Sequence, residues 1–181
     1  SLTITGSSFD GNSGGLSGGA LYLNGSSASI STSTFVGNSA ETGGAVQSNS
    51  GTVDIANSTF VGNTAINGGA IDNRLGAMTI GYSTLLNNNA SGQGDSLENQ
   101  TLGSTLNVRA SILQGLGASN CAGTIGNLGN NLSWPAGNNC IGTQANPQLG
   151  TLAASGGPSQ VALPRPGSPA FDAIAPGTNG C

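Results

Sequence analysis

Few side chains in this sequence could take part in catalysis. The chain has 181 residues, with seven Asp or Glu, three Lys or Arg and no His. One acidic pair stands out, because Asp72 and Glu98 occupy equivalent positions of two successive sequence repeats. Two such carboxylates could act as the acid and base of a polysaccharide-cleaving enzyme. We expect Arg74 to form an ordinary ion pair with Asp72, and the sequence has no lysine to act as a lyase base.

The three cysteines could form a disulfide or bind a metal. Cys121 and Cys140 bracket a loop rich in Gly and Asn, and a disulfide there would remove about 3 kcal/mol of chain entropy from the unfolded state. Three cysteines without a histidine offer too few ligands for a metal site. We therefore predict a Cys121–Cys140 disulfide, an unpaired Cys181, no metal and no other cofactor.

The low charge of the chain restricts its partners. Only 6% of the residues are charged, against about 25% in ordinary soluble domains, and the formal net charge is −4. Such a chain cannot neutralise a phosphate backbone, so nucleic acid is not an expected partner. No run approaches the roughly 20 apolar residues of a membrane span. The candidate disulfide and the polar, lysine-free composition favour an extracellular or cell-surface location.

A repeated sequence motif determines the expected fold. Ser33-Thr34-Phe35-Val36-Gly37-Asn38 returns as Ser58-Thr59-Phe60-Val61-Gly62-Asn63, with weaker copies that begin at Ser7, Ser83 and Ser111. Each repeat of about 25 residues contains short alternating apolar stretches and no helical periodicity. One repeat cannot bury its apolar face alone, so successive repeats must stack as rungs about 4.8 Å apart.

The sequence therefore predicts an all-β, right-handed parallel β-helix. Residues 1–115 are expected to form the repeat rungs. Residues 116–181 are expected to form one or more irregular last rungs, the Cys-bracketed loop and a C-terminal capping tail of the same domain.

Equivalent residues of successive rungs should form columns inside and outside the helix. Two apolar columns comprise Leu2, Ala28, Val53, Met78 and Leu106, and Ile4, Ile30, Ile55, Ile80 and Val108. The core ladder comprises Phe9, Phe35, Phe60, Leu85 and Leu113. The Asn ladder comprises Asn12, Asn38, Asn63 and Asn88, whose amides should bond one another and stabilise a turn. An outward polar column comprises Tyr22, Gln47, Asp72 and Glu98.

The neighbours of the core ladder point outward if the phenylalanines point inward. This interaction face comprises Thr34, Val36, Thr59, Val61, Thr84 and Leu86. One of its columns bears hydroxyls and the other is apolar, and an apolar patch of this kind often marks a contact surface. Three interpretations stay open: ordinary exposed strand residues, lateral association with another chain or a tail segment, and, less favoured, ice binding.

The C-terminal part carries a more specific pattern. Asn146-Pro147-Gln148-Leu149-Gly150-Thr151-Leu152 is followed by Gly156-Gly157-Pro158 and by Gly167-Ser168-Pro169-Ala170-Phe171-Asp172. Together with the upstream Phe-x-Gly-Asn and Gly-Gly-Ala phrases, this pattern resembles the bacterial choice-of-anchor Q domain proteins and the related polymorphic outer-membrane proteins. The resemblance implies a secreted or surface right-handed β-helix, mostly without assigned catalysis. We expect the tail to lie over the last rung and shield its strand edges.

These observations favour a non-enzymatic structural protein that self-associates or acts in adhesion. The sequence opens in a strand-like Leu2-Thr3-Ile4 with no evident cap, and an uncapped rung could stack head-to-tail on another copy to form filaments. The alternative is a polysaccharide-binding or pectinase-like polysaccharide-cleaving β-helix that uses Asp72 and Glu98. Ice binding is the least favoured function.

Overall fold

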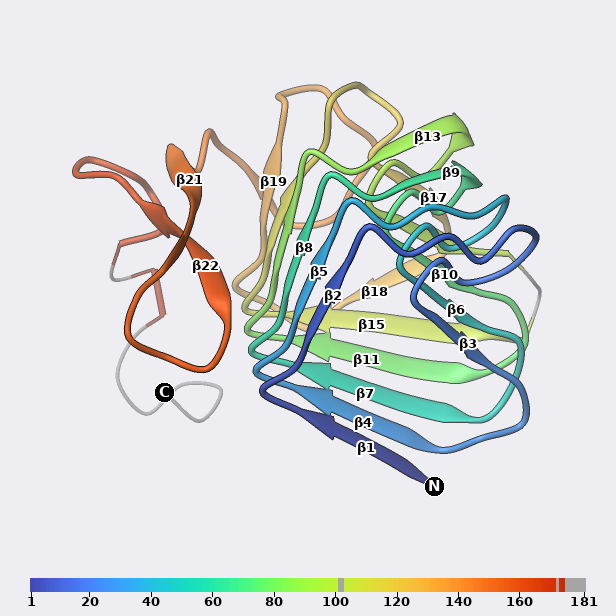
Figure 1. Cartoon of the computed structure of the whole chain (residues 1–181). Coiled ribbons are helices and arrows are strands. Elements are labelled where there is room, and N and C mark those ends of the chain that lie inside the picture. The colour runs from blue at the N-terminus through green and yellow to red at the C-terminus, as the bar shows by residue number, and fades with distance from the viewer. Residues whose placement is uncertain (101–102, 172, 175–181) are drawn as a thin grey trace.

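The computed structural model describes residues 1–100, 103–171, 173 and 174, which form an all-β parallel solenoid of stacked rungs (Figure 1). This confirms the fold class that the repeats predicted. The described residues contain no helix long and apolar enough to cross a membrane.

Three parallel sheets form the sides of the solenoid. Sheet 1 contains β1 (Leu2–Thr5), β4 (Ala28–Ser31), β7 (Thr52–Ala56), β11 (Ala77–Gly81), β15 (Thr105–Arg109) and β18 (Ile125–Asn127). Sheet 2 contains β2 (Ser8–Asp10), β5 (Thr34–Val36), β8 (Thr59–Val61), β12 (Thr84–Leu86), β16 (Ile112–Gln114), β19 (Leu132–Trp134) and β20 (Thr143–Gln144). Sheet 3 contains β3 (Leu21–Leu23), β6 (Val46–Ser48), β10 (Ile71–Asn73), β14 (Leu97–Asn99) and β17 (Cys121–Gly123). In two middle rungs, β9 (Thr64–Asn67) pairs with β13 (Asn89–Gln93) between sheets 2 and 3.

The strand register aligns the predicted apolar columns. In sheet 2, Phe9 pairs with Phe35 and Phe35 with Phe60, and the ladder continues through Leu85 to Leu113. The three phenylalanine rings stack with centroids 4.8 and 4.6 Å apart and nearly parallel planes. Because each repeat supplies a residue of similar shape at the same position, side chains of adjacent rungs pack against one another in one buried core.

Serines at the turns from sheet 1 to sheet 2 bond adjacent rungs together, and Asn131 takes this role at the turn before β19. Ser58 Oγ donates to the Ala56 carbonyl oxygen (2.9 Å) and accepts the backbone N–H of Ser33 in the previous rung (3.2 Å). The residue before it, Asn57, has a φ of 49°, and the equivalent Thr32 has a φ of 45°. The hydroxyl thus provides a hydrogen-bond partner for a carbonyl oxygen and a backbone N–H at the left-handed turn between the two sheets.

The Asn ladder stabilises the turn that follows sheet 2. Asn63 Oδ1 accepts Nδ2–H and backbone N–H of Asn38, both at 2.9 Å, and Asn63 Nδ2 donates to the Phe35 carbonyl oxygen (3.0 Å). Gly62 precedes it with a φ of 64°, and in the next rung Asn87 takes this left-handed position with a φ of 52°. Asparagine tolerates that conformation better than other side chains do, which explains the substitution.

The chain continues beyond residue 115 with strands that still pair to the solenoid, through β20. After them, β21 (Leu149–Ala154) and β22 (Gln160–Pro164) form an antiparallel hairpin. The hairpin lies beside the solenoid against sheet 2 (Figure 1), whereas we had expected the tail over the last rung. Asp172 and Cys181, which belong to the predicted tail, lie outside the described residues.

Candidate functional site

The polar column of sheet 3 brings the two acidic candidates together. Tyr22, Gln47, Asp72 and Glu98 pair in register across β3, β6, β10 and β14. Asp72 and Glu98 are therefore direct neighbours on adjacent rungs. Their side chains face away from the core, because the preceding residue on each strand belongs to the core.

This column faces outward, but apart from Tyr22, which is exposed, its side chains are not open to solvent. Asp72 is 0% exposed and Glu98 is 3% exposed. The chain turns back over the column at Gly43, Gly68 and Gly94, whose φ values are 62°, 61° and 72°. A Cβ at Gly68 would lie 2.9 Å from that of Asp72, so a residue with a side chain could not close this turn. Burial on the outer face is a feature that the alternating pattern alone did not predict.

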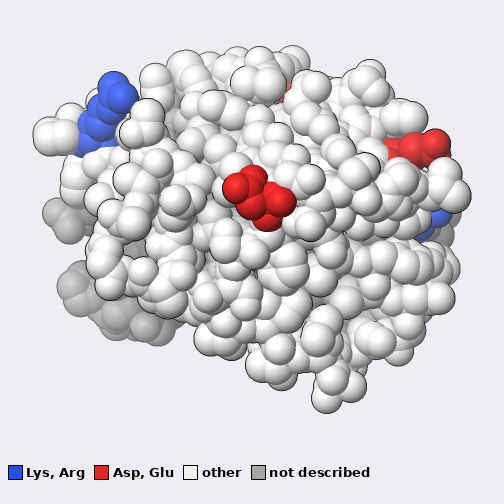
Figure 2. Space-filling model, viewed as in Figure 1, with Lys and Arg blue, Asp and Glu red and all other residues white. Residues whose placement is uncertain are grey.

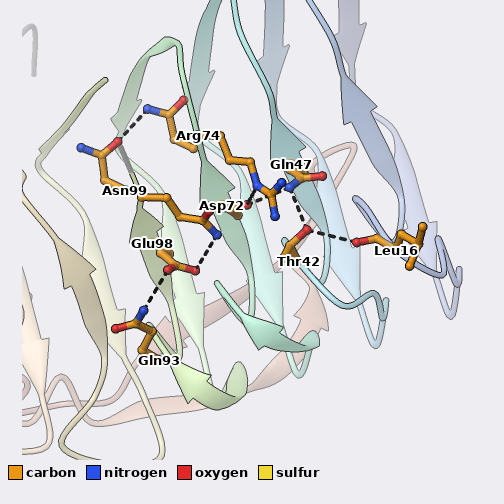
Figure 3. Close-up of polar contacts among 10 residues, drawn as sticks. Leu16, Thr42, Gln47, Asp72, Arg74, Gln93, Glu98 and Asn99 are labelled. Atoms are coloured by element: carbon orange, nitrogen blue, oxygen red, sulfur yellow. Dashed lines mark hydrogen bonds and ion pairs between the residues drawn. The ribbon is translucent and has the colours of Figure 1, made fainter. Parts of the chain in front are cut away.

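Hydrogen bonds run along the column and join three rungs (Figure 3). Thr42 Oγ1 donates to the Leu16 carbonyl oxygen (3.1 Å) and accepts from Gln47 Nε2 (2.7 Å). Gln47 Nε2 also donates to Asp72 Oδ2 (2.8 Å), which accepts a second bond from Arg74 Nε (3.3 Å). The expected Asp72–Arg74 ion pair is therefore present.

Glu98 is held by two amides. Gln93 Nε2 donates to Glu98 Oε1 (3.3 Å) and Gln100 Nε2 donates to Oε2 (3.2 Å). Burial raises the pKa of Glu98, the Gln100 bond opposes this, and the charge of Asp72 adds to it. Burial likewise raises the pKa of Asp72, although the Gln47 and Arg74 contacts oppose the shift. Both carboxyls therefore favour the protonated form more than an exposed acid does.

Both acidic side chains are almost completely buried in this conformation. The side chain of Arg74, 39% exposed, is the solvent-facing part of the Asp72 ion pair. Two buried acceptor atoms, Asp72 Oδ1 and Gln47 Oε1, have no hydrogen-bond partner. Within the described residues, no group of three or more His, Cys, Asp or Glu side chains could hold a metal ion.

The predicted interaction face is largely covered. Thr34, Thr59 and Leu86 are buried, and Val36, Val61 and Thr84 are half-buried. Thr34 Oγ1 accepts the backbone N–H of Gln160 in β22 (3.0 Å) and donates to the Gln160 carbonyl oxygen (3.3 Å). A segment of the same chain therefore occupies part of this face, in line with one of the open interpretations, contact with a tail segment.

The predicted disulfide joins Cys121 in β17 to Cys140 in the loop after β19, with Cα atoms 4.8 Å apart. Two asparagines of that loop support it. Asn139 Oδ1 accepts the backbone N–H of Cys121 (3.0 Å), and Asn138 Oδ1 accepts that of Cys140 (2.6 Å). The bond ties the last strand of sheet 3 to the irregular end of the solenoid.

Sequence reasoning missed the side chains that cover the polar column. Thr42 and Gln93 bond the column residues that follow them five positions later, across the Gly turn. The signal was a polar residue directly before each Gly-Gly or Gly-Asp pair, at Thr42, Asn67 and Gln93. That spacing places two polar columns face to face.

Comparisons with known proteins give no match, whether with family models, curated proteins or solved structures. The fold and the geometry of these sites therefore carry the functional argument.

Proposed function

We propose that this protein is a non-enzymatic β-solenoid of the cell exterior that works by contact, associating end to end through its rungs. The proposal rests on the exposure of apolar side chains in the end rung. Leu2 is 37% exposed, and Ile4 and Phe9 are half-buried, whereas Ile30 and Phe35 in the same columns are 0% exposed. The apolar columns thus reach the end of the solenoid with one side uncovered.

The two ends of the solenoid have complementary strand edges. Within the described residues, β1, β2 and β3 pair on one side only, and so do β18, β20 and β17 at the other end. All solenoid strands run parallel, so stacking one copy on another would continue the same hydrogen-bond ladders. Such a head-to-tail contact does not close on itself and would generate a filament.

Several features support an external location and a contact role. The disulfide suits an oxidising compartment. Charged side chains are sparse on the face in Figure 2, so electrostatic repulsion between copies is weak. The C-terminal resemblance to choice-of-anchor Q and polymorphic outer-membrane proteins favours the same setting and is compatible with adhesion.

Light scattering on two charge variants tests where the contact lies. Leu2→Lys places a charge on the end rung, and Val61→Lys places one on the lateral face beside β22. We expect concentration-dependent association of the unchanged chain, reduced by Leu2→Lys and retained by Val61→Lys. Loss of association in Val61→Lys alone would favour lateral contact, and a monomer at every concentration would count against self-association.

Polysaccharide binding or cleavage is the second candidate, favoured by the raised pKa of two neighbouring carboxyls. A glycosidase needs one carboxyl that stays protonated near neutral pH. Incubation with acidic polysaccharides should give new reducing ends or unsaturated products if this function holds. Asp72→Asn and Glu98→Gln should abolish them, and binding without products would indicate a glycan-binding module.

A further inference from the structure

The polar column contains a carboxyl pair with more negative charge than its surroundings neutralise. Asp72 and Glu98 are adjacent in register and almost completely buried. The only basic side chain bonded to either carboxyl among the described residues is Arg74. If both acids were ionised, the buried pair would carry two negative charges against one guanidinium, which is itself partly in solvent. Burying an uncompensated charge is costly, so this state is disfavoured.

The hydrogen-bond pattern identifies the carboxyl oxygen of the pair that has no hydrogen-bond donor. Asp72 Oδ2 accepts two bonds, and each oxygen of Glu98 accepts one from a glutamine amide. Asp72 Oδ1 accepts none although it is buried, and the neighbouring Gln47 Oε1 is also without a donor. A buried oxygen that receives no hydrogen bond loses its hydration without replacement, and this loss costs more for an ionised carboxyl than for a neutral one.

We propose that the Asp72–Glu98 pair retains a proton above the pH at which exposed carboxyls lose theirs, carried on Asp72 Oδ1, and that this proton strengthens the contact between the two rungs. The contact between β10 and β14 is then more stable at acidic pH than at alkaline pH. This inference concerns a proton-binding site of the solenoid and does not depend on end-to-end association.

The groups around Asp72 leave few alternatives for neutralising it. The strand before it contributes the uncharged Gln47, its own strand leads into Arg74, and the strand after it contributes Glu98. The turn segments contribute the uncharged Asn67 before Gly68 and Gln93 before Gly94, and Gln100 follows β14. The carboxyl of Asp95, which follows Gly94, accepts the backbone N–H of Ala90. The chain contains no Lys or His that could approach instead.

The sign of the pH dependence follows from burial. Burial raises the pKa of both carboxyls, so the folded protein binds protons more tightly than the unfolded chain does. The stabilising effect is complete below the ordinary carboxyl pKa of about 4 and is lost as the pH rises through the raised values. Within that window, each group changes the folding equilibrium by up to about tenfold per pH unit.

Denaturant unfolding of the unchanged chain and of Asp72→Asn tests the proposal between about pH 4 and pH 8. Asparagine resembles a neutral carboxyl in shape, so the variant should lose most of the decline in stability with rising pH. Asp54→Asn is the matched control, because Asp54 is an exposed carboxyl on the same rung, in β7. That variant should keep the pH dependence of the unchanged chain.

Carbon-13 NMR of the carboxyl groups in the unchanged chain gives a readout that needs no variant. We expect one carboxyl of the pair to stay protonated well above pH 4. Glu98→Gln should change the titration of Asp72, and Asp72→Asn should change the titration of Glu98. Ordinary titration of both carboxyls would overturn the proposal. Stability that rises from pH 5 to pH 8, or a pH slope in Asp72→Asn equal to that of the unchanged chain, would overturn it as well.

Discussion

The inner rungs and the end rung of this solenoid have nearly the same sequence pattern but different environments. Phe35 and Phe60 are completely buried between rings of adjacent rungs, whereas Phe9 stacks on Phe35 with one face and is only half-buried. Asn63 bonds the rungs on both sides, and Asn12 bonds only Asn38. A rung therefore gains most of its stability from its two neighbours, and the first rung of this sequence has a neighbour on one side only among the described residues.

The largest effect should come from removing an inner ring. Phe60→Ala should lower the free energy of unfolding by about 3 to 5 kcal/mol, because Phe35 and Leu85 cannot close over the cavity. Phe9→Ala should cost markedly less, since part of that ring is already in solvent. Thermal or denaturant melts measure the difference. Equal losses from both variants would mean that the end rung is covered in solution.

The Asn ladder should show the same contrast between an inner rung and the end rung, with smaller losses in the free energy of unfolding. Asn63→Ala removes the bond to the Phe35 carbonyl oxygen and the acceptor of the Asn38 backbone N–H in a buried turn, which should cost about 1 to 3 kcal/mol. Asn12→Ala removes a side chain that is exposed and donates one bond, so its cost should be near 0.5 kcal/mol. Comparison of the two unfolding curves decides whether the ladder stabilises mainly the interior rungs.

A local effect is expected for the tail hairpin. Thr34→Val keeps the shape of the side chain but removes both bonds to Gln160, and we expect a loss of about 1 kcal/mol together with faster amide exchange in β22. The control is Ser8→Ala, the equivalent position of the end rung, which should leave β22 unchanged. Hydrogen exchange by mass spectrometry measures both. Unaltered exchange in β22 after Thr34→Val would show that other contacts hold the hairpin.

The repeats were sufficient to predict the fold and the register, because a parallel solenoid places equivalent residues directly above one another. The Cys121–Cys140 pair was predicted from the loop that the two cysteines bracket, outside the clear repeats. The repeats also placed Asp72 beside Glu98. They did not predict that the column is buried, because burial results from the left-handed turns at Gly68 and Gly94, which fold the chain over its own sheet. Nor did they place the hairpin on sheet 2, since this contact depends on a single non-repeated segment around Gln160.

The most direct test of the end-contact account is electron microscopy of the purified chain over a range of concentrations. The account predicts filaments along the solenoid axis, with a subunit repeat of about 24 to 34 Å if five to seven rungs of roughly 4.8 Å separate successive copies. Leu2→Lys should shorten or abolish these filaments while the fold remains intact by circular dichroism. Dispersed monomers of the unchanged chain at the highest concentration would contradict the account.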